Sequence, residues 1–268
     1  MRPHRSYRVI TRVCILALIA ATSIWLARQF RQRNLNRALI AAIKRSDASA
    51  VDTLLAAGAD PNSRDTPLKQ ESVFQKLKYL FHPPPHDLSP TAILTDLAQH
   101  SEDYNFPQAS HRIVKALLMK GADPNSRDAD GNSPLSSLFP EFYDGKNFRE
   151  PANNSALLEI ILNAGARTST ITPGPIGPPL TNATLHDWPE AVRILLDHGA
   201  NVNETDQFGN TPLMNASSNN YPDIVRTLLA RGADANIRNK GGFRPLYAAD
   251  QMGYTEVVRI LKARGAKD

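Results

Sequence analysis

The chain contains one cysteine, Cys14, among its 268 residues. A single cysteine cannot form an internal disulfide, and structural zinc sites built on cysteine need several such ligands. The sequence therefore excludes a disulfide-stapled scaffold and a cysteine-based zinc site. An absence of disulfides suits a reducing compartment but is also compatible with an oxidising one, so it leaves the location of the protein open.

Acidic residues are missing from the first 45 positions, which hold ten lysines and arginines. The whole chain has 31 basic and 26 acidic residues, so residues 46–268 hold 21 basic against 26 acidic side chains, a net charge of −5. A surface that binds nucleic acid needs clustered lysine and arginine side chains that displace counterions from the phosphates. We therefore expect no nucleic-acid partner, since the positive charge of the chain is confined to its N-terminus.

Motifs for catalysis, phosphate binding and metal binding are also missing. His82 and His86 flank three prolines that hold them extended, and no further ligands follow at the spacing of a metal site. The stretch TPGPIGPP, residues 172–179, has glycines but no lysine after them, so it is not a phosphate-binding loop. No nucleophile stands beside a matching base. We predict a protein that is not an enzyme and has no cofactor, no metal and no small-molecule substrate.

A hydrophobic run, VCILALIAATSIWLA, extends from Val13 to Ala27 behind a tail with four arginines. A spanning helix needs about 20 residues, and counting back to Val9 gives nineteen if Arg12 extends to the headgroups. We expect a basic tail over residues 1–12, a transmembrane signal-anchor over 13–27 and a basic linker over 28–34. A signal peptide cleaved near residues 21–23 is the alternative.

The distribution of arginines favours one orientation in the membrane. Basic residues flank the hydrophobic run on both sides, but the short tail is the part expected to stay in the cytoplasm. We expect a single-pass protein of a bacterial inner membrane whose C-terminal domain lies outside the cytoplasm. If the segment is cleaved instead, the protein is secreted or periplasmic.

One sequence motif recurs in the rest of the chain. LLMKGADPNSRDADGNSPL at 117–135 returns as LLDHGANVNETDQFGNTPL at 195–213 and LLARGADANIRNKGGFRPL at 228–246. Its glycine stands at Gly58, Gly121, Gly165, Gly199, Gly232 and Gly265, and the last gaps are 34, 33 and 33 residues. This period, with Thr-Pro-Leu opening one helix and Leu-Leu-x-x-Gly-Ala closing the next, resembles the ankyrin repeat. The resemblance implies an all-α repeat solenoid over residues 35–268, an ankyrin stack of about six helix-turn-helix repeats with hairpin loops, plus one N-terminal hydrophobic helix.

The residues of the motif have local roles that fit this fold. Thr211 suits a helix N-cap, Pro212 suits the first helical position, and Gly232 suits a left-handed helix end. A single unit cannot bury its apolar face, so neighbouring units must stack. The histidine that follows Thr-Pro-Leu in the family, where it joins a hydrogen-bond network between repeats, is replaced here. The residues in its place are Ala92, Ser136, Thr181, Met214 and Tyr247.

Three insertions interrupt the repeats. The distance from the helix-opening proline to the helix-closing glycine is 20 residues in the regular units but 31 from Pro90 to Gly121 and from Pro134 to Gly165. The two extra loops, near 100–110 and 141–151, belong to neighbouring repeats and should lie side by side. A third insertion falls near 66–88. The alternative to a binding role is that these loops pack against the stack and bury apolar surface.

The sequence thus predicts a non-catalytic protein–protein interaction module tethered to a membrane. The alternatives are an inhibitor or immunity protein that neutralises a toxin or enzyme in the bacterial envelope, a small-ligand or metal-binding receptor, or a spacer. The acidic body favours a basic partner. Hairpin tips, the concave face and aromatic insertions supply the predicted partner-binding residues: Tyr104, Phe106, Ala129, Asp130, Asn132, Phe142, Tyr143, Phe148, Gln207, Phe208, Asn210, Ser218, Asn219, Lys240, Phe243, Gln251 and Met252.

Overall fold

The computed structural model describes residues 4–63, 108–127, 133–139, 154–169 and 177–267, with the side chains of 4–17, 108–110, 137 and 154 left out. These residues form helices and connecting turns, without strands. In chain order the helices are α1 (His4–Lys44), α2 (Ala48–Ala56), α5 (Gln108–Met119), the short 3₁₀ helix η1 (Ser136–Leu138), α6 (Asn154–Asn163), α7 (Pro179–Leu185), α8 (Pro189–Asp197), α9 (Pro212–Ser218), α10 (Pro222–Ala230), α11 (Pro245–Gln251) and α12 (Thr255–Ala263).

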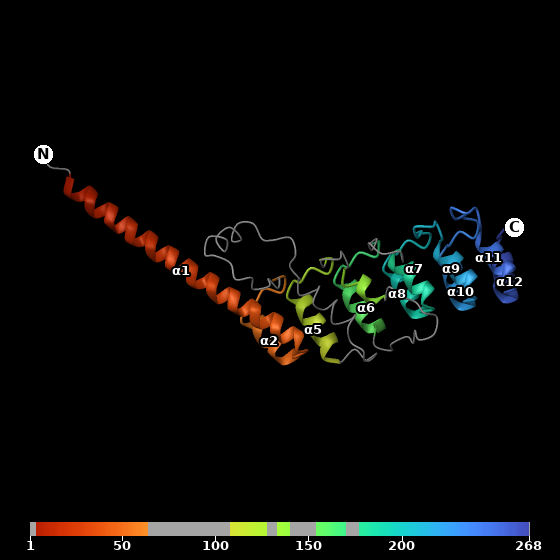
Figure 1. The fold of residues 1–268 in the computed structure, drawn as a ribbon, viewed down its shortest axis with the longest axis horizontal. Helices are drawn as coiled ribbons and strands as arrows, with labels where there is room; N and C mark the ends of the chain where they lie inside the picture. The colour runs from red at the N-terminus through yellow and green to blue at the C-terminus, as the bar shows by residue number, and fades with distance from the viewer. Residues whose placement is uncertain (1–3, 64–107, 128–132, 140–153, 170–176, 268) are drawn as a thin grey trace.

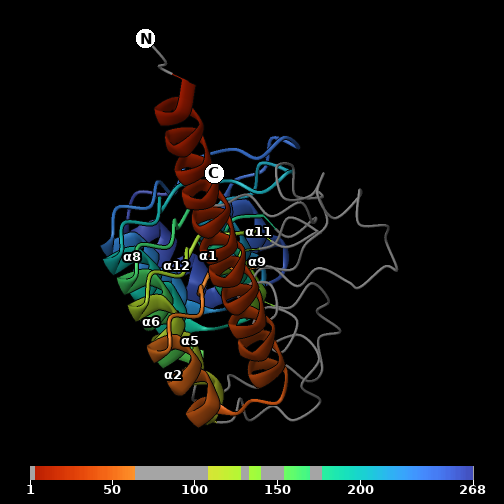
Figure 2. The same ribbon diagram turned by 90° about the vertical axis from the view of Figure 1, so that its left-hand side faces the viewer.

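The helices pack as a row of antiparallel pairs (Figure 1). Helices α2, α5, α6, α8, α10 and α12 follow one another as the second helices of successive units. Helices α7, α9 and α11 form the first-helix layer of the last three units, and Figure 2 shows the two layers from the end of the row. The repeated pairing confirms the predicted helical ankyrin architecture.

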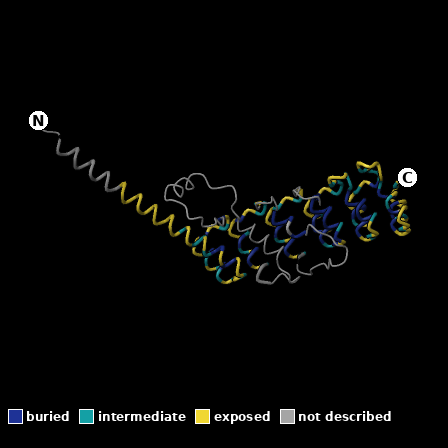
Figure 3. Tube along the Cα trace, viewed as in Figure 1, coloured by how far each residue is buried: buried dark blue, intermediate teal, exposed yellow. Residues whose placement is uncertain are grey.

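One apolar core runs along the whole row (Figure 3). Each unit contributes a leucine near the end of its second helix, and these residues are at most 5% exposed: Leu55, Leu117, Leu162, Leu195, Leu228 and Leu261 in the described units. A helix of nine residues has too little apolar surface to be stable alone. The core therefore holds the helices only because each unit covers the next.

Each second helix ends as the sequence predicts. The six repeat glycines have φ between 79° and 94°, in the left-handed region. The alanine after each glycine donates its amide to the carbonyl five residues earlier, for example Ala200 to Leu195 at 2.9 Å and Ala233 to Leu228 at 3.0 Å. This is the hydrogen bond of a Schellman motif, which satisfies a carbonyl that the helix leaves open.

The start of helix α9 also has the predicted geometry. Thr211 is extended, and its side chain accepts the amide of Met214 at 3.2 Å, while Pro212 takes the first helical position. Helix α7 begins differently, because its N-cap residue is Pro178 and offers no side-chain oxygen. A residue from the next hairpin, described below, supplies that oxygen.

Helix α1 is 41 residues long, which corresponds to about 62 Å. Its last part is the first helix of the first repeat, where Leu39, Ala42 and Ile43 are fully buried. Gln32 donates to the carbonyl of Gly58 at 2.8 Å, and Asn36 accepts the amide of Asp60 at 2.9 Å. Residues 28–34, expected to be a linker, are therefore helical and lie within α1.

The structure does not show the predicted membrane segment. Across the residues with described side chains, no helix combines the length and the apolar character needed to cross a bilayer. The expected span over 13–27 begins among residues whose side chains lie outside that description. The span stays a prediction from the sequence.

Candidate partner-binding surface

About half of the predicted binding residues lie outside the described part of the chain. They include the five insertion aromatics and one hairpin tip: Tyr104, Phe106, Ala129, Asp130, Asn132, Phe142, Tyr143 and Phe148. The insertions near 66–88 and 141–151 lie outside it too, as do residues 100–107 of the insertion near 100–110. Residues 108–110, predicted to belong to that insertion, are instead the first residues of helix α5. The remaining nine predicted residues belong to the last three repeats.

The hairpin between α8 and α9 ends in a tight turn that exposes Phe208. Asp206 accepts the backbone amides of Phe208 and Asn210, both at 2.8 Å, and also accepts the side-chain amide of Asn210 at 3.0 Å. Asn210 is thus used inside the turn. Gln207 and Phe208 are both exposed, Phe208 at 60%.

The hairpin between α10 and α11 holds Phe243 in a defined place. Asn239 and Phe243 exchange two hydrogen bonds at 3.0 Å, one through the Asn239 side chain. The ring of Phe243 lies over Gly241, where an added Cβ would come within 2.9 Å of the ring. The ring then stacks on Tyr247 of α11, with ring centroids 4.9 Å apart and planes 14° apart.

Hydrogen bonds join these two hairpins. The amide of Lys240 donates to the carbonyl of Phe208 at 3.0 Å, and Asn239 donates its side-chain amide to Asn210 at 2.8 Å. The predicted residues Phe208, Lys240 and Phe243 are thereby brought together, and Tyr247 joins them. We call Phe208, Lys240, Phe243 and Tyr247 the tip surface.

Tyr247 is a surface residue that the sequence analysis did not select. It occupies the position where the family has a histidine, and that substitution was the available signal. Its interior equivalents Ser136, Thr181 and Met214 are buried, whereas Tyr247 is 46% exposed. Exposure here depends on whether another hairpin covers the position, which a local motif does not reveal.

The predicted residues on the first helices form a second group, away from the tip surface. Ser218 and Asn219 end helix α9, and both donate to the carbonyl of Asn215, at 3.0 and 2.8 Å. Gln251 and Met252 end helix α11, about 10 Å along the axis from its hairpin end. Both are exposed, Met252 at 60%.

Glu204 has an unusual environment that the sequence analysis also missed. Its carboxylate accepts the backbone amide of Thr181 at 3.0 Å and lies 3.3 Å from the Thr181 hydroxyl, so it caps helix α7 in place of Pro178. Burial raises the pKa of Glu204 to about 7, although these hydrogen bonds act in the opposite direction. Pro178 stands where a regular repeat has threonine, and this was the only sign in the sequence that helix α7 needs a cap from elsewhere.

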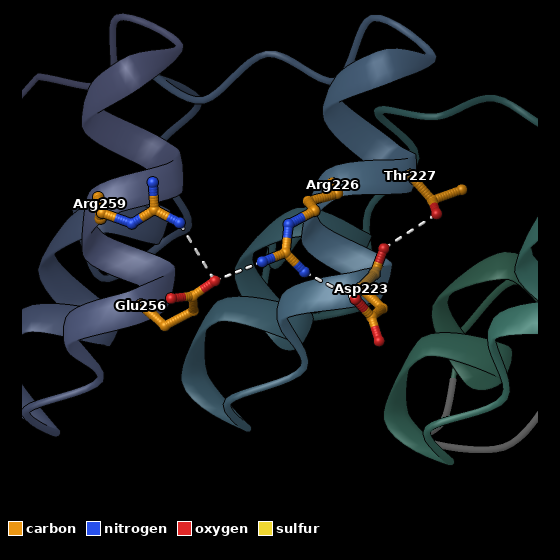
Figure 4. Close-up of polar contacts among 5 residues, drawn as sticks. All are labelled: Asp223, Arg226, Thr227, Glu256 and Arg259. Carbon is orange, nitrogen blue, oxygen red and sulfur yellow. Dashed lines mark hydrogen bonds and ion pairs between the residues drawn. The ribbon is translucent and has the colours of Figure 1, made fainter.

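The outer face of the second helices is charged and internally paired (Figure 4). Arg226 of α10 binds Asp223 at 2.7 Å and also Glu256 of α12, which Arg259 contacts at 3.3 Å. A similar set joins Arg193, Asp197 and Arg231 on α8 and α10. These exposed pairs contribute little stability individually. They leave this face less suited to an apolar contact than the tip surface.

The described residues contain no group of three or more histidine, cysteine, aspartate or glutamate side chains placed to hold a metal ion. The site is an exposed aromatic and basic surface on two hairpins that are joined by hydrogen bonds. Exposed aromatic side chains of this kind are typical of surfaces that contact other proteins.

Comparisons with known proteins agree with the repeat architecture. The family described as Ankyrin repeats (3 copies) matches residues 151–239 and 182–268. A crystal structure of an ankyrin repeat domain from Acinetobacter baumannii has a TM-score of 0.64 at 24% identity, covering 85% of this chain and 98% of that one. The ankyrin repeat protein EF0377 has a TM-score of 0.59 at 23% identity, covering 85% and 97%.

A curated protein also matches over part of the chain. The phosphocholine transferase AnkX of Legionella pneumophila is 31% identical over 99 residues, which are 37% of this chain but only 10% of that protein. The shared stretch is thus a small part of the larger protein, as expected for a match between repeats. Residues 151–268 thus match the ankyrin-repeat family model, and the described part of the chain has the ankyrin-repeat fold.

Proposed function

We propose that this chain is a non-catalytic protein-binding module held at a membrane by its N-terminal helix. The observation that carries the binding role is the tip surface, where Phe208, Phe243 and Tyr247 expose between 46% and 60% of their area. Aromatic side chains that are exposed and held rigidly are enriched among the residues that dominate binding energy at interfaces. Ankyrin folds commonly serve as interaction modules, and the solved relatives share this fold.

Affinity capture tests the binding role. The bait is the full chain in mild detergent, used with extract of the source cells. One parallel bait carries Phe243→Ala with Tyr247→Ala, and a second lacks residues 100–107 and 141–151, which spares helix α5. A third carries Arg193→Ala on the outer face as a control. A stoichiometric protein retained by the wild type and the control but lost with one of the other baits supports the proposal. The absence of any stoichiometric partner on a folded bait contradicts it.

The membrane role rests on α1 and on the sequence before it. Residues 18–30 of α1 project from the stack with apolar side chains in the open: Leu18, Ile19, Ile24, Trp25, Leu26 and Phe30 are each at least 47% exposed. Exposed apolar area of this extent is unfavourable in water. A bilayer would cover it, with the N-terminal arginines at the headgroups. The proposed location is a bacterial inner membrane with the repeats outside the cytoplasm, or the periplasm if the segment is cleaved.

Fractionation of cells tests this second role. The full chain should remain in the membrane pellet after an alkaline carbonate wash, while a chain that starts at residue 28 should be released. Protease added to spheroplasts should digest the repeats if they lie outside the cytoplasm. Release of the full chain by carbonate, together with an unchanged N-terminus, contradicts the anchor.

Within this proposal, the partner could be a toxin or enzyme of the envelope that the repeats inhibit. The captured partner is then assayed with and without the chain. Suppression of its activity supports an inhibitor or immunity role, and unchanged activity supports a scaffold.

A further inference from the structure

The last repeat leaves uncovered a position that the interior repeats bury. Thr181 is fully buried beneath Glu204 of the following hairpin, and Met214 is 4% exposed. Tyr247 occupies the same place in α11, but among the described residues no further hairpin lies over it. Phe243 stacks on it without closing the surface, since both rings remain nearly half exposed. The aromatic pair Phe243 and Tyr247 is therefore exposed at the position that a following hairpin covers in the interior repeats.

The pair is organised before any partner arrives. Gly241 leaves room for the Phe243 ring, and the two hairpins are tied through Lys240 to Phe208 and Asn239 to Asn210. Side chains already fixed lose less conformational freedom on binding, which favours affinity. The surface thus has the rigidity expected of a docking site.

Charge distinguishes this end of the chain from the rest of the body. Residues 234–268 contain seven basic and four acidic residues, a net charge of +3, whereas residues 46–233 contain 14 basic and 22 acidic residues, a net of −8. The hairpin between α10 and α11, residues 231–244, has four basic residues, Arg231, Arg238, Lys240 and Arg244, and one acidic residue, Asp234. Asp206 on the neighbouring tip is engaged by Asn210 and two backbone amides.

We propose that the tip surface binds an acidic segment of a partner protein that carries an aromatic or large aliphatic side chain. The apolar side chain covers the Phe243–Tyr247 pair, and flanking carboxylates pair with Lys240 and its neighbouring arginines. This inference rests on the proposed binding role and gives the partner's chemistry. It reverses the expectation from the body's average charge, because the local field at a surface decides which partners approach it.

Selection from a defined library tests the inference. The probe is a display library of random twelve-residue peptides, selected against the immobilised full chain in detergent at low ionic strength. Enriched peptides should be net negative and contain an aromatic or large aliphatic residue. Binding of a synthetic winner, measured by fluorescence anisotropy, should weaken about tenfold with Phe243→Ala and several-fold with Lys240→Glu.

A matched charge reversal controls for nonspecific electrostatics. Lys115 of α5 is exposed and distant in the stack, so Lys115→Glu makes the same change in net charge and should leave peptide binding unchanged. Each variant is checked by circular dichroism and thermal melting, and the exposure of Phe243 and Lys240 predicts little change. An aromatic-free copy of the winning peptide should bind at least tenfold more weakly.

Three outcomes overturn the inference. These are enrichment of neutral or basic peptides, acidic peptides that bind Lys240→Glu as well as the wild type, and no enrichment at all. The outcome for the proposed binding role can be told apart from this. If the tip variants capture a natural partner as well as the wild type does, the chain is a binding module whose site lies elsewhere. Acidic peptides bound at the tip with no natural partner captured support the chemistry of the surface and contradict the module's role in the cell.

Discussion

At Glu204 a carboxyl group is buried and hydrogen-bonded at once, and the two effects act on its charge in opposite directions. Burial dominates and raises its pKa from 4.5 to about 7. The folded protein therefore favours the protonated form of Glu204 more than the unfolded chain does. The stabilisation this provides is fully present below pH 4.5 and is lost as the pH rises through about 7.

The first prediction concerns this pH dependence. Between pH 5 and pH 8 the free energy of unfolding should fall by up to about 3 kcal/mol through Glu204. Glu204→Gln keeps an oxygen for the Thr181 amide and cannot ionise, so its thermal midpoint should change less over the same range. Burial and then the nearby Asp223 raise the pKa of Asp187 too, so some slope should remain in the variant. Equal slopes in the two proteins would rule out the assignment to Glu204.

A second residue-scale feature is backbone strain at Asn220. Its φ is 60°, in the left-handed region, while Gly253 fills the same place in the next repeat with φ 73°. Asparagine tolerates this region better than most residues, but glycine has no Cβ penalty there. The turn is therefore strained at one repeat and unstrained at the next.

Asn220→Gly should stabilise the protein by about 0.5 kcal/mol, the relief of strain less the added freedom of glycine when unfolded. The adjacent Asn219→Gly is the control. Asn219 has φ −106° and donates to Asn215, so glycine there should destabilise. Urea unfolding of both variants measures the difference, and stabilisation by both or by neither would refute the strain argument.

At the scale of elements, asparagines tie successive hairpins together. Asn125 donates to the carbonyl of Gly165 at 3.1 Å and accepts the amide of Arg167 at 2.8 Å. Asn62 and Asn236 make the equivalent pairs with the repeats that follow them. In the third unit the same position is Ser169, whose side chain is shorter. The hairpins of the third and fourth units therefore lack this asparagine bridge.

The third prediction restores that bridge. Ser169→Asn should add bonds to Gly199 and to the amide of residue 201, and stabilise by about 1 kcal/mol. Asn125→Ala should remove a bridge and destabilise by about 1–2 kcal/mol, because it leaves two backbone groups unsatisfied. Thermal melting compares the two. A Ser169→Asn protein no more stable than the wild type would show that the third and fourth hairpins are not aligned for the bond.

At the scale of the whole molecule, the main contacts among the described helices join adjacent units, so damage should stay local. Leu195 is fully buried in α8, and its neighbour Leu196 is only partly buried. Leu195→Ala should cost about 2–5 kcal/mol and Leu196→Ala much less. Hydrogen exchange should show faster exchange in α6, α8 and α10 than in α2 and α12. Uniform loss of protection along the chain would mean that the stack unfolds as one unit.

The sequence predicted those parts of the fold that depend on local chemistry. The helix-ending glycines, the Thr211 cap and the proline starts could be read because each acts on residues within one turn. Phe208 and Phe243 could be selected because an aromatic residue in a turn-rich loop is unusual. Both side chains are exposed in the structure, and their role in binding stays a prediction, like that of the other selected residues.

Other features depend on contacts that a local motif does not contain. The burial of Glu204 requires the preceding repeat, and Tyr247 is exposed because none of the described hairpins covers it. The continuity of α1 had a signal that was not used, since no glycine or proline interrupts His4–Lys44. The average charge of the body predicts a basic partner, whereas the tip surface supports the proposal of an acidic one, because charge is unevenly distributed along the repeats.

Helix α1 connects the projecting N-terminal segment to the repeats without a break. The helix that leaves the stack is the same one whose last turns are clamped by Gln32, Asn36 and the buried Leu39. Any structure that binds the N-terminal end of α1 therefore also fixes the orientation of the repeats relative to itself. The tip surface at the far end would then move over a small range of positions, and a partner could approach it from one side only.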